Sequence, residues 1–161
     1  MNDIKKLNII KVILLILLVG FIFFICADKD IADKNIREIQ GEMGRDNIIS
    51  SLESCNDRDL LKYYGIPSGN VDGYLFKKAK SPMAVDELLI LKLREENQSG
   101  AMLDCVYKRI EDQKNNFDGY GVRQTELLSM CKVFAKGKYV FFAVGESADK
   151  WEERFNEFME K

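Results

Sequence analysis

The sequence contains no histidine among its 161 residues. Histidine is the usual general base at neutral pH, the common partner of Ser and Cys nucleophiles, and the commonest transition-metal ligand. Its absence excludes the Ser-His and Cys-His classes of hydrolase and disfavours zinc enzymes.

Cysteine is scarce, and no two cysteines form a C-x-x-C pair. The four stand at positions 26, 55, 105 and 131, a spacing that fits neither a zinc ribbon nor a thioredoxin-type motif. If Cys26 lies in a membrane, one disulfide could join two of Cys55, Cys105 and Cys131, and the spacing does not select the pair. We expect Cys105 and Cys131 to be small, buried apolar residues.

The chain also has no basic run and no nucleotide-binding loop. Its 24 basic and 26 acidic residues give a net charge of −2, so binding to nucleic acid is not expected. Gly119-Tyr120-Gly121 lacks the third glycine and the preceding strand of a dinucleotide fingerprint. The sequence predicts no cofactor, no metal site and no catalytic residues, and thus a protein that is not an enzyme.

The most distinctive stretch is the uncharged apolar run at residues 12–27 (VILLILLVGFIFFICA). As a helix it is roughly 24 Å long, and its Leu, Ile, Val and Phe residues favour insertion into a bilayer by roughly 4 to 8 kcal/mol. We predict a transmembrane signal anchor whose partner is the lipid bilayer. A buried core helix is the alternative, but it would need a polar stripe that the run lacks.

Cleavage after the run is a further alternative. Ala27 could precede a signal-peptidase site, and Cys26 could be acylated as in lipoproteins, but Ile25 suits neither reaction. We expect residues 1–11, with Lys5 and Lys6, to form a short cytoplasmic tail. The predicted location is the plasma membrane, with a single span and the C-terminal domain outside.

Residues 28–55 read as a connector that is helical in part. Ala32, Ile36, Ile39 and Met43 recur at helical spacing and make one narrow apolar stripe. This stripe would dock on the following domain or lie near the membrane surface.

Residues 56–161 are predicted to form an extracytoplasmic α+β domain, a small and mainly antiparallel sheet of about four strands covered by two helices. A short helix is expected from Asn56, capped by that residue and ended by Gly65. The other expected elements are strands at 71–77 and 88–93, a helix at 99–117, a hairpin of 130–135 with 138–144, and a last helix from Glu146 or Ser147 that carries Trp151 in the core.

Several short motifs in this region occur in a familiar order. They are Tyr64-Gly65-Ile66, Pro82-Met83 leading into Asp86-Glu87-Leu88, the long helix, Gly137-Lys138-Tyr139-Val140 and Ala148-Asp149. In this order they resemble the bacterial domain of unknown function family 4358, from about Leu60 to the C-terminus. The resemblance implies a membrane-bound or lipoprotein-like extracytoplasmic domain and no assigned activity.

The motif residues Tyr64, Asp86 and Glu87 are the candidates for a site. Two neighbouring carboxylates serve acid–base chemistry when one pKa is raised. Acids at the start of a strand are ordinarily solvated, however, and successive strand residues point to opposite faces. We therefore expect a structural role for all three, and turns to explain Gly65 and Gly137.

Two functional hypotheses follow. The first is a membrane-tethered, non-catalytic module that binds an envelope protein or glycan. The alternative is a carboxylate-dependent envelope enzyme such as a glycan hydrolase, which would need two facing acids about 5 to 10 Å apart.

Overall fold

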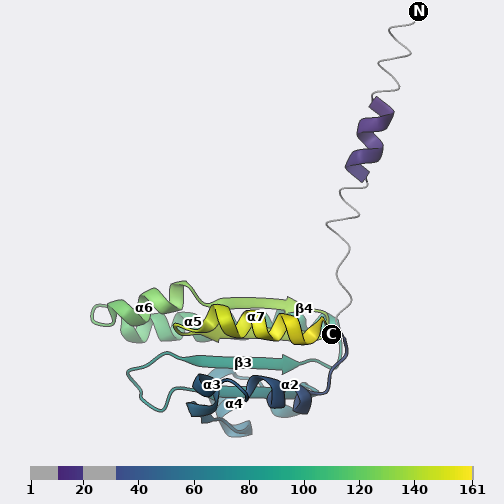
Figure 1. The fold of residues 1–161 in the computed structure, drawn as a ribbon. Coiled ribbons are helices and arrows are strands. Elements are labelled where there is room, and N and C mark those ends of the chain that lie inside the picture. Colours follow the sequence, from purple (N-terminus) through teal and green to yellow (C-terminus); the bar gives the residue numbers. More distant parts are fainter. Residues whose placement is uncertain (1–10, 20–31, 161) are drawn as a thin grey trace, which may run out of the picture. The chain divides into compact units, whose positions relative to one another are not determined.

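The computed structural model describes residues 11–19 and 32–160 (Figure 1). The chain divides into two compact units, residues 1–30 and 31–161. In the first unit residues 11–19 are helical, and the rest of the predicted membrane segment, residues 20–27, lies outside the described residues. No helix within 11–19 and 32–160 is long and apolar enough to cross a membrane.

The second unit is built on a five-stranded antiparallel sheet with the order β1-β2-β3-β5-β4. The strands are β1 (Glu53–Ser54), β2 (Gly73–Lys78), β3 (Glu87–Lys92), β4 (Lys132–Lys136) and β5 (Tyr139–Val144). The α+β class and the antiparallel pairing are confirmed. The expected four strands are joined by the short edge strand β1, which has too few residues to show any alternation of its own.

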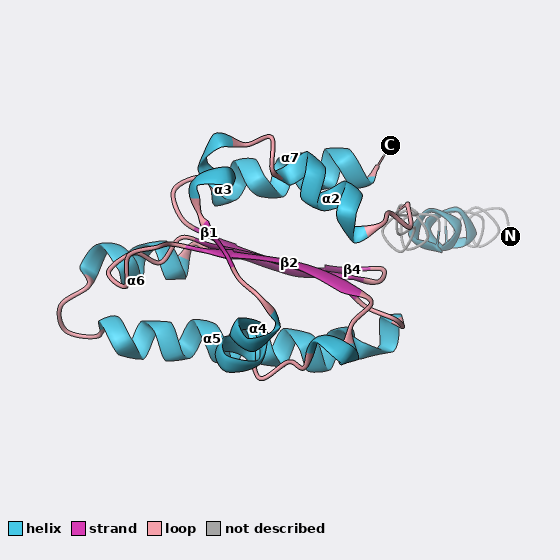
Figure 2. Ribbon diagram, turned by 90° about the horizontal axis from the view of Figure 1, so that it is seen from below, coloured by secondary structure: helices cyan, strands magenta, loops and turns pink. Residues whose placement is uncertain are grey.

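Helices cover both faces of this sheet (Figure 2). One face carries α2 (Ile36–Met43), α3 (Asn47–Ser51) and α7 (Ala148–Met159), and the other carries α4 (Asp57–Tyr64), α5 (Ser99–Phe117) and α6 (Val122–Ser129). The prediction of two covering helices was wrong. Every residue of β5 is buried, and so is every residue of β3 except Lys92. Because these strands are apolar on both sides, both faces need a covering layer.

The ends of α4 follow the predicted capping chemistry. The Asn56 side chain accepts hydrogen bonds from the first turn, and the Asp59 carboxylate accepts the backbone N–H of Asn56. Gly65 ends the helix at φ 70°, a left-handed conformation that glycine adopts without strain. Tyr64, the last residue of this helix, is thereby held at a fixed place over the sheet.

The β4–β5 hairpin was also predicted, with a turn one residue away from the observed one. Lys136 pairs with Tyr139, so Gly137 and Lys138 form the two-residue loop. Gly137 has φ 53°, and no residue other than glycine has positive φ in the described chain. Positive φ at the first loop position alone is typical of a type II′ turn, which matches the twist of the flanking strands.

The segment expected to be a connector packs into the domain. Ile39 and Ile49 are fully buried against α7 and the sheet, and the Ala32 N–H donates to the Met159 carbonyl at 3.2 Å. The docking alternative for the apolar stripe is therefore confirmed. The compact unit begins at residue 31, well before the predicted boundary at residue 56.

We predict that Ile39→Ala destabilises the whole domain by about 2–5 kcal/mol, because it leaves a cavity between α2 and α7. Ile48→Ala is the matched control, since Ile48 is 47% exposed in α3, and it should change stability by less than about 0.5 kcal/mol. Urea denaturation of the full chain in detergent, followed by Trp151 fluorescence, measures both variants. Equal effects would show that residues 36–51 are a loosely attached connector.

Candidate functional site

Glu87, the first residue of β3, is a buried carboxylate with only 1% of its surface exposed. It pairs with Lys78 of β2 on one side and Val144 of β5 on the other, and α5 covers it. The expectation that Asp86 and Glu87 are both solvated is wrong for Glu87. The first residue of a strand is exposed to solvent when the strand lies at a sheet edge, but β3 lies in the middle of the sheet.

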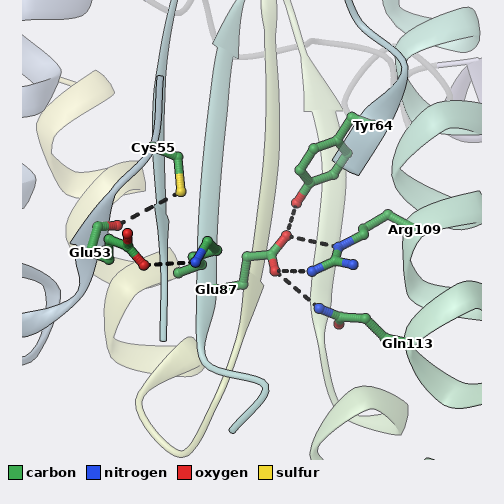
Figure 3. A network of polar contacts seen from close by, with 7 residues as sticks. Glu53, Cys55, Tyr64, Glu87, Arg109 and Gln113 are labelled. Atoms are coloured by element: carbon green, nitrogen blue, oxygen red, sulfur yellow. Dashed lines mark hydrogen bonds and ion pairs between the residues drawn. The ribbon is translucent and has the colours of Figure 1, made fainter. Parts of the chain in front are cut away.

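Four hydrogen bonds from two helices surround this carboxylate (Figure 3). The Tyr64 hydroxyl donates to Oε1, which also accepts Arg109 Nε at 3.3 Å. Oε2 accepts Arg109 Nη2 at 2.8 Å and Gln113 Nε2 at 3.0 Å. Tyr64 and Glu87, two of the three candidate residues, thus meet in a closed, hydrogen-bonded cluster. We call these four residues the Glu87 cluster.

The protonation states within the cluster follow from burial and charge. Burial and the neighbouring Glu87 carboxylate raise the pKa of Tyr64 well above its ordinary value, so the phenol keeps its proton and remains a donor. Burial disfavours the charged guanidinium of Arg109, but the hydrogen bonds and charge of Glu87 outweigh it and raise that pKa. Arg109 therefore stays charged at neutral pH, with its Nη2 at 2.8 Å from Glu87 Oε2.

A pocket of ≈470 Å³ opens beside the cluster, at the end of the sheet where β2 stops and β3 starts. Its wall combines residues of the β2–β3 loop, polar residues of α5 and three aromatic rings. The lining residues are Tyr63, Lys78, Ala79, Lys80, Ser81, Pro82, Ala84, Asp86, Glu87, Arg109, Gln113, Asn116, Phe117 and Tyr120. The first described residues of the unit lie at the other end of the sheet, where Asp33 pairs with Lys92 at 2.8 Å.

Most charges at the pocket are already paired. Lys78 Nζ lies 2.7 Å from Glu53 Oε2, and Arg109 is bound to Glu87. Lys80 and Asp86 form no ion pair with any described residue. The buried Oε1 of Gln113 has no hydrogen-bond partner in the described chain. The pocket therefore offers one cation, one anion and one unsatisfied acceptor.

Asp86 and Glu87 both line this pocket, although adjacent strand residues were expected to point apart. Asp86 precedes the first residue of β3, so the regular alternation does not yet apply to it. Gly145 leaves space for the side chain of Asp86. A Cβ on Gly145 would lie 2.5 Å from Asp86 Oδ1, and its φ of 133° is one that side chains rarely adopt.

Two members of the cluster, Arg109 and Gln113, were missed by sequence reasoning. Arg109 lies among charged residues in sequence, a pattern typical of a solvent-exposed helix face, but its side chain is only 14% exposed. Gln113 occupies a stripe position between Ile110 and Phe117, where an apolar residue would be usual. A polar residue in an apolar stripe was the available signal for a buried partner.

The three cysteines that the structure describes do not form a nucleophilic site. Cys55, Cys105 and Cys131 are free thiols and half-buried, so the expectation of full burial for Cys105 and Cys131 was too strong. Burial raises the pKa of Cys55 to about 12, which leaves little reactive thiolate at neutral pH. No group of three or more Cys, Asp or Glu residues in the described ranges is arranged to hold a metal ion.

We predict that Glu87→Gln destabilises the domain by about 3–5 kcal/mol, because it leaves the Arg109 charge buried without its counter-ion. The double variant Glu87→Gln/Arg109→Met should lose less than the sum of the two single losses. Urea denaturation of the four chains in a double-mutant cycle measures the coupling. Additive losses would mean that the pair is not coupled in the folded protein.

The raised pKa of Tyr64 predicts a specific alkaline effect. Below about pH 10 both the folded and the unfolded chain keep the phenol proton, and above it only the folded chain does. The free energy of unfolding should then fall with pH by up to about 1.4 kcal/mol per unit from this group. Tyr64→Phe lacks this contribution, so its difference from the natural chain should shrink above pH 10 in urea titrations. Tyr63→Phe is the control, and a similar pH profile for both variants would contradict the assignment.

Comparison with known proteins identifies a family for most of the second unit. No curated protein and no solved structure matches the chain. The family described as Domain of unknown function (DUF4358) matches residues 48–145, from the start of α3 to the end of β5. This range covers more than half of the chain and includes all of the Glu87 cluster, and the chain therefore belongs to the DUF4358 family.

Proposed function

We propose that the protein is a membrane-tethered, non-catalytic binding module whose domain lies outside the plasma membrane. The observation that carries the binding role is the Glu87 cluster beside an open pocket. Its carboxylate is saturated by four hydrogen bonds, so it shapes the wall of the pocket and has no position left for exchanging a proton with a substrate.

The chemistry of glycan hydrolysis argues against the enzyme hypothesis. Hydrolysis needs two carboxyl groups that face each other across the substrate, with one acting as a proton donor. Asp86 and Glu87 are the two acids that line this pocket, they are neighbours in sequence, and Glu87 is held by Arg109. The geometry favours binding over catalysis.

The membrane tether is supported by the sequence and by the exposure of the first helix. Residues 12–27 carry no charge, and Lys5, Lys6 and Lys11 precede them. All side chains from Val12 to Val19 are exposed, on every side of the helix, which leaves a wholly apolar surface without a protein partner in the described chain. Such a helix is stable in lipid, where its surface meets acyl chains.

The pocket and the first described residues of the second unit lie at opposite ends of the sheet. Ala32, the first described residue of the second unit, lies at the Lys92 end of the sheet, where its N–H donates to the Met159 carbonyl. The pocket opens at the Lys78 and Glu87 end of the same strands. A ligand that occupies the pocket therefore does not compete with the packing of residues 32–34 onto the domain.

The tether predicts that the full chain stays in the membrane fraction after extraction with alkaline carbonate. The double variant Leu15→Lys/Leu18→Lys should be released, because each lysine near the centre of the run costs about 3 kcal/mol of insertion free energy. Leu61→Lys, at an exposed site in α4, is the matched control and should remain with the membrane. Release of the unaltered chain would overturn the tether.

The external location predicts labelling of Val122→Cys by a membrane-impermeant maleimide in intact cells. Val122 is 83% exposed, so the new thiol should react quickly. The unaltered chain, in which the three described cysteines are half-buried free thiols, gives the background. Labelling that appears only after the cells are lysed would place the domain inside.

A further inference from the structure

We infer that the pocket beside the Glu87 cluster binds a sugar residue of a glycan chain. This inference rests on the proposed binding function and names its ligand class. Three observations support it: the charges at the pocket are balanced, hydrogen-bond donors and acceptors lack partners there among the described residues, and an exposed aromatic ring lies at the rim.

The charges at the pocket do not select an ion. Glu87 neutralises Arg109, and Glu53 neutralises Lys78. Lys80 and Asp86 remain, and their charges are opposite. A simple anion would be attracted by Lys80 and repelled by Asp86, so the net field favours a neutral ligand that both donates and accepts hydrogen bonds.

The polar groups at the pocket without a partner in the described part of the chain include both hydrogen-bond donors and hydrogen-bond acceptors. Gln113 is 6% exposed, and its buried Oε1 lacks a hydrogen-bond donor in the described chain, which is unfavourable while the oxygen stays unpaired. Arg109 uses Nε and Nη2 on Glu87, and Figure 3 shows its third nitrogen without a dashed contact to the cluster. Asp86 adds acceptors, and Lys80 adds a donor. Sugar hydroxyl and acetamido groups offer both partners at close spacing.

Tyr120 provides an apolar platform at the rim. It is 61% exposed, although its ring lies at 5.8 Å from the ring of Phe117, and its hydroxyl donates to the Asn116 carbonyl at 2.6 Å. The ring is thus fixed while one surface remains open. The C–H face of a pyranose packs on such a ring, because both have an apolar face and polar groups at the edge.

The size and openness of the pocket favour one residue of a longer chain. A volume of ≈470 Å³ is within the usual range for small-ligand sites and holds one or two sugar rings. The exposed rim at Tyr120 leaves room for the chain to continue out of the pocket. A free amino acid would match the Lys80 and Asp86 charges but would leave Tyr120 without a partner.

The test uses the full-length protein in detergent and two trisaccharide probes, chitotriose and cellotriose, which share a linkage and differ in their acetamido groups. Isothermal titration measures affinity, and saturation-transfer NMR identifies the protons in contact. We expect chitotriose to bind, because its amide N–H supplies the donor that Gln113 Oε1 lacks, and cellotriose to bind at least fivefold more weakly.

Variants separate the pocket from the rest of the surface. Tyr120→Ala and Lys80→Ala should each weaken chitotriose binding at least fivefold, and Tyr107→Ala, at a similarly exposed tyrosine of α5 outside the pocket, should leave it unchanged. Lys80→Ala keeps the test valid if Tyr120→Ala does not fold. Absence of trisaccharide binding, equal losses for Tyr120 and Tyr107, or preferential binding of glycine or inorganic phosphate would overturn the sugar assignment. Those outcomes leave carbonate extraction and Val122→Cys labelling unchanged, so they are distinct from failure of the tether.

Discussion

The burial of one carboxylate constrains how the parts of this domain meet. Glu87 lies in a central strand under α5, and an ionised group in such a place is tolerated only when its oxygens are hydrogen-bonded and its charge is matched. Tyr64 supplies one bond from the end of α4, and Arg109 and Gln113 supply the others from α5. The cluster therefore fixes two helices against the sheet at the end where the pocket opens.

The two helical layers that cover the sheet follow from the apolar character of its central strands. Strands β3 and β5 are almost wholly apolar, so each face of the sheet must be covered. One core contains Trp151 and Phe155 of α7 together with Ile39 of α2, and the other contains Val106 and Ile110 of α5. The polar pocket lies between the loop that joins β2 to β3 and the C-terminal half of α5. Packing thus places an open, polar site at this end of the sheet.

Local signals predicted the elements that local chemistry controls. Three such signals act within a few residues and could therefore be recognised in the sequence. They are the capping box at Asn56 and Asp59, the glycine at position 65 and the hairpin turn at Gly137. The helix α6 was missed because it is short and follows a loop without a side-chain cap. Its buried residues, Leu127 and Leu128, are too few to show a period.

The sequence by itself determined the uncharged apolar run at residues 12–27, the α+β class, the hairpin and the family motifs, because each depends on neighbouring residues or on composition. Only the tertiary structure decided that Glu87 is buried and that Arg109, 22 residues away, is its counter-ion. It also decided that the stripe around Ile39 belongs to the core. The physical reason is that burial depends on which surfaces meet across the sheet, and those surfaces come from segments far apart in the chain.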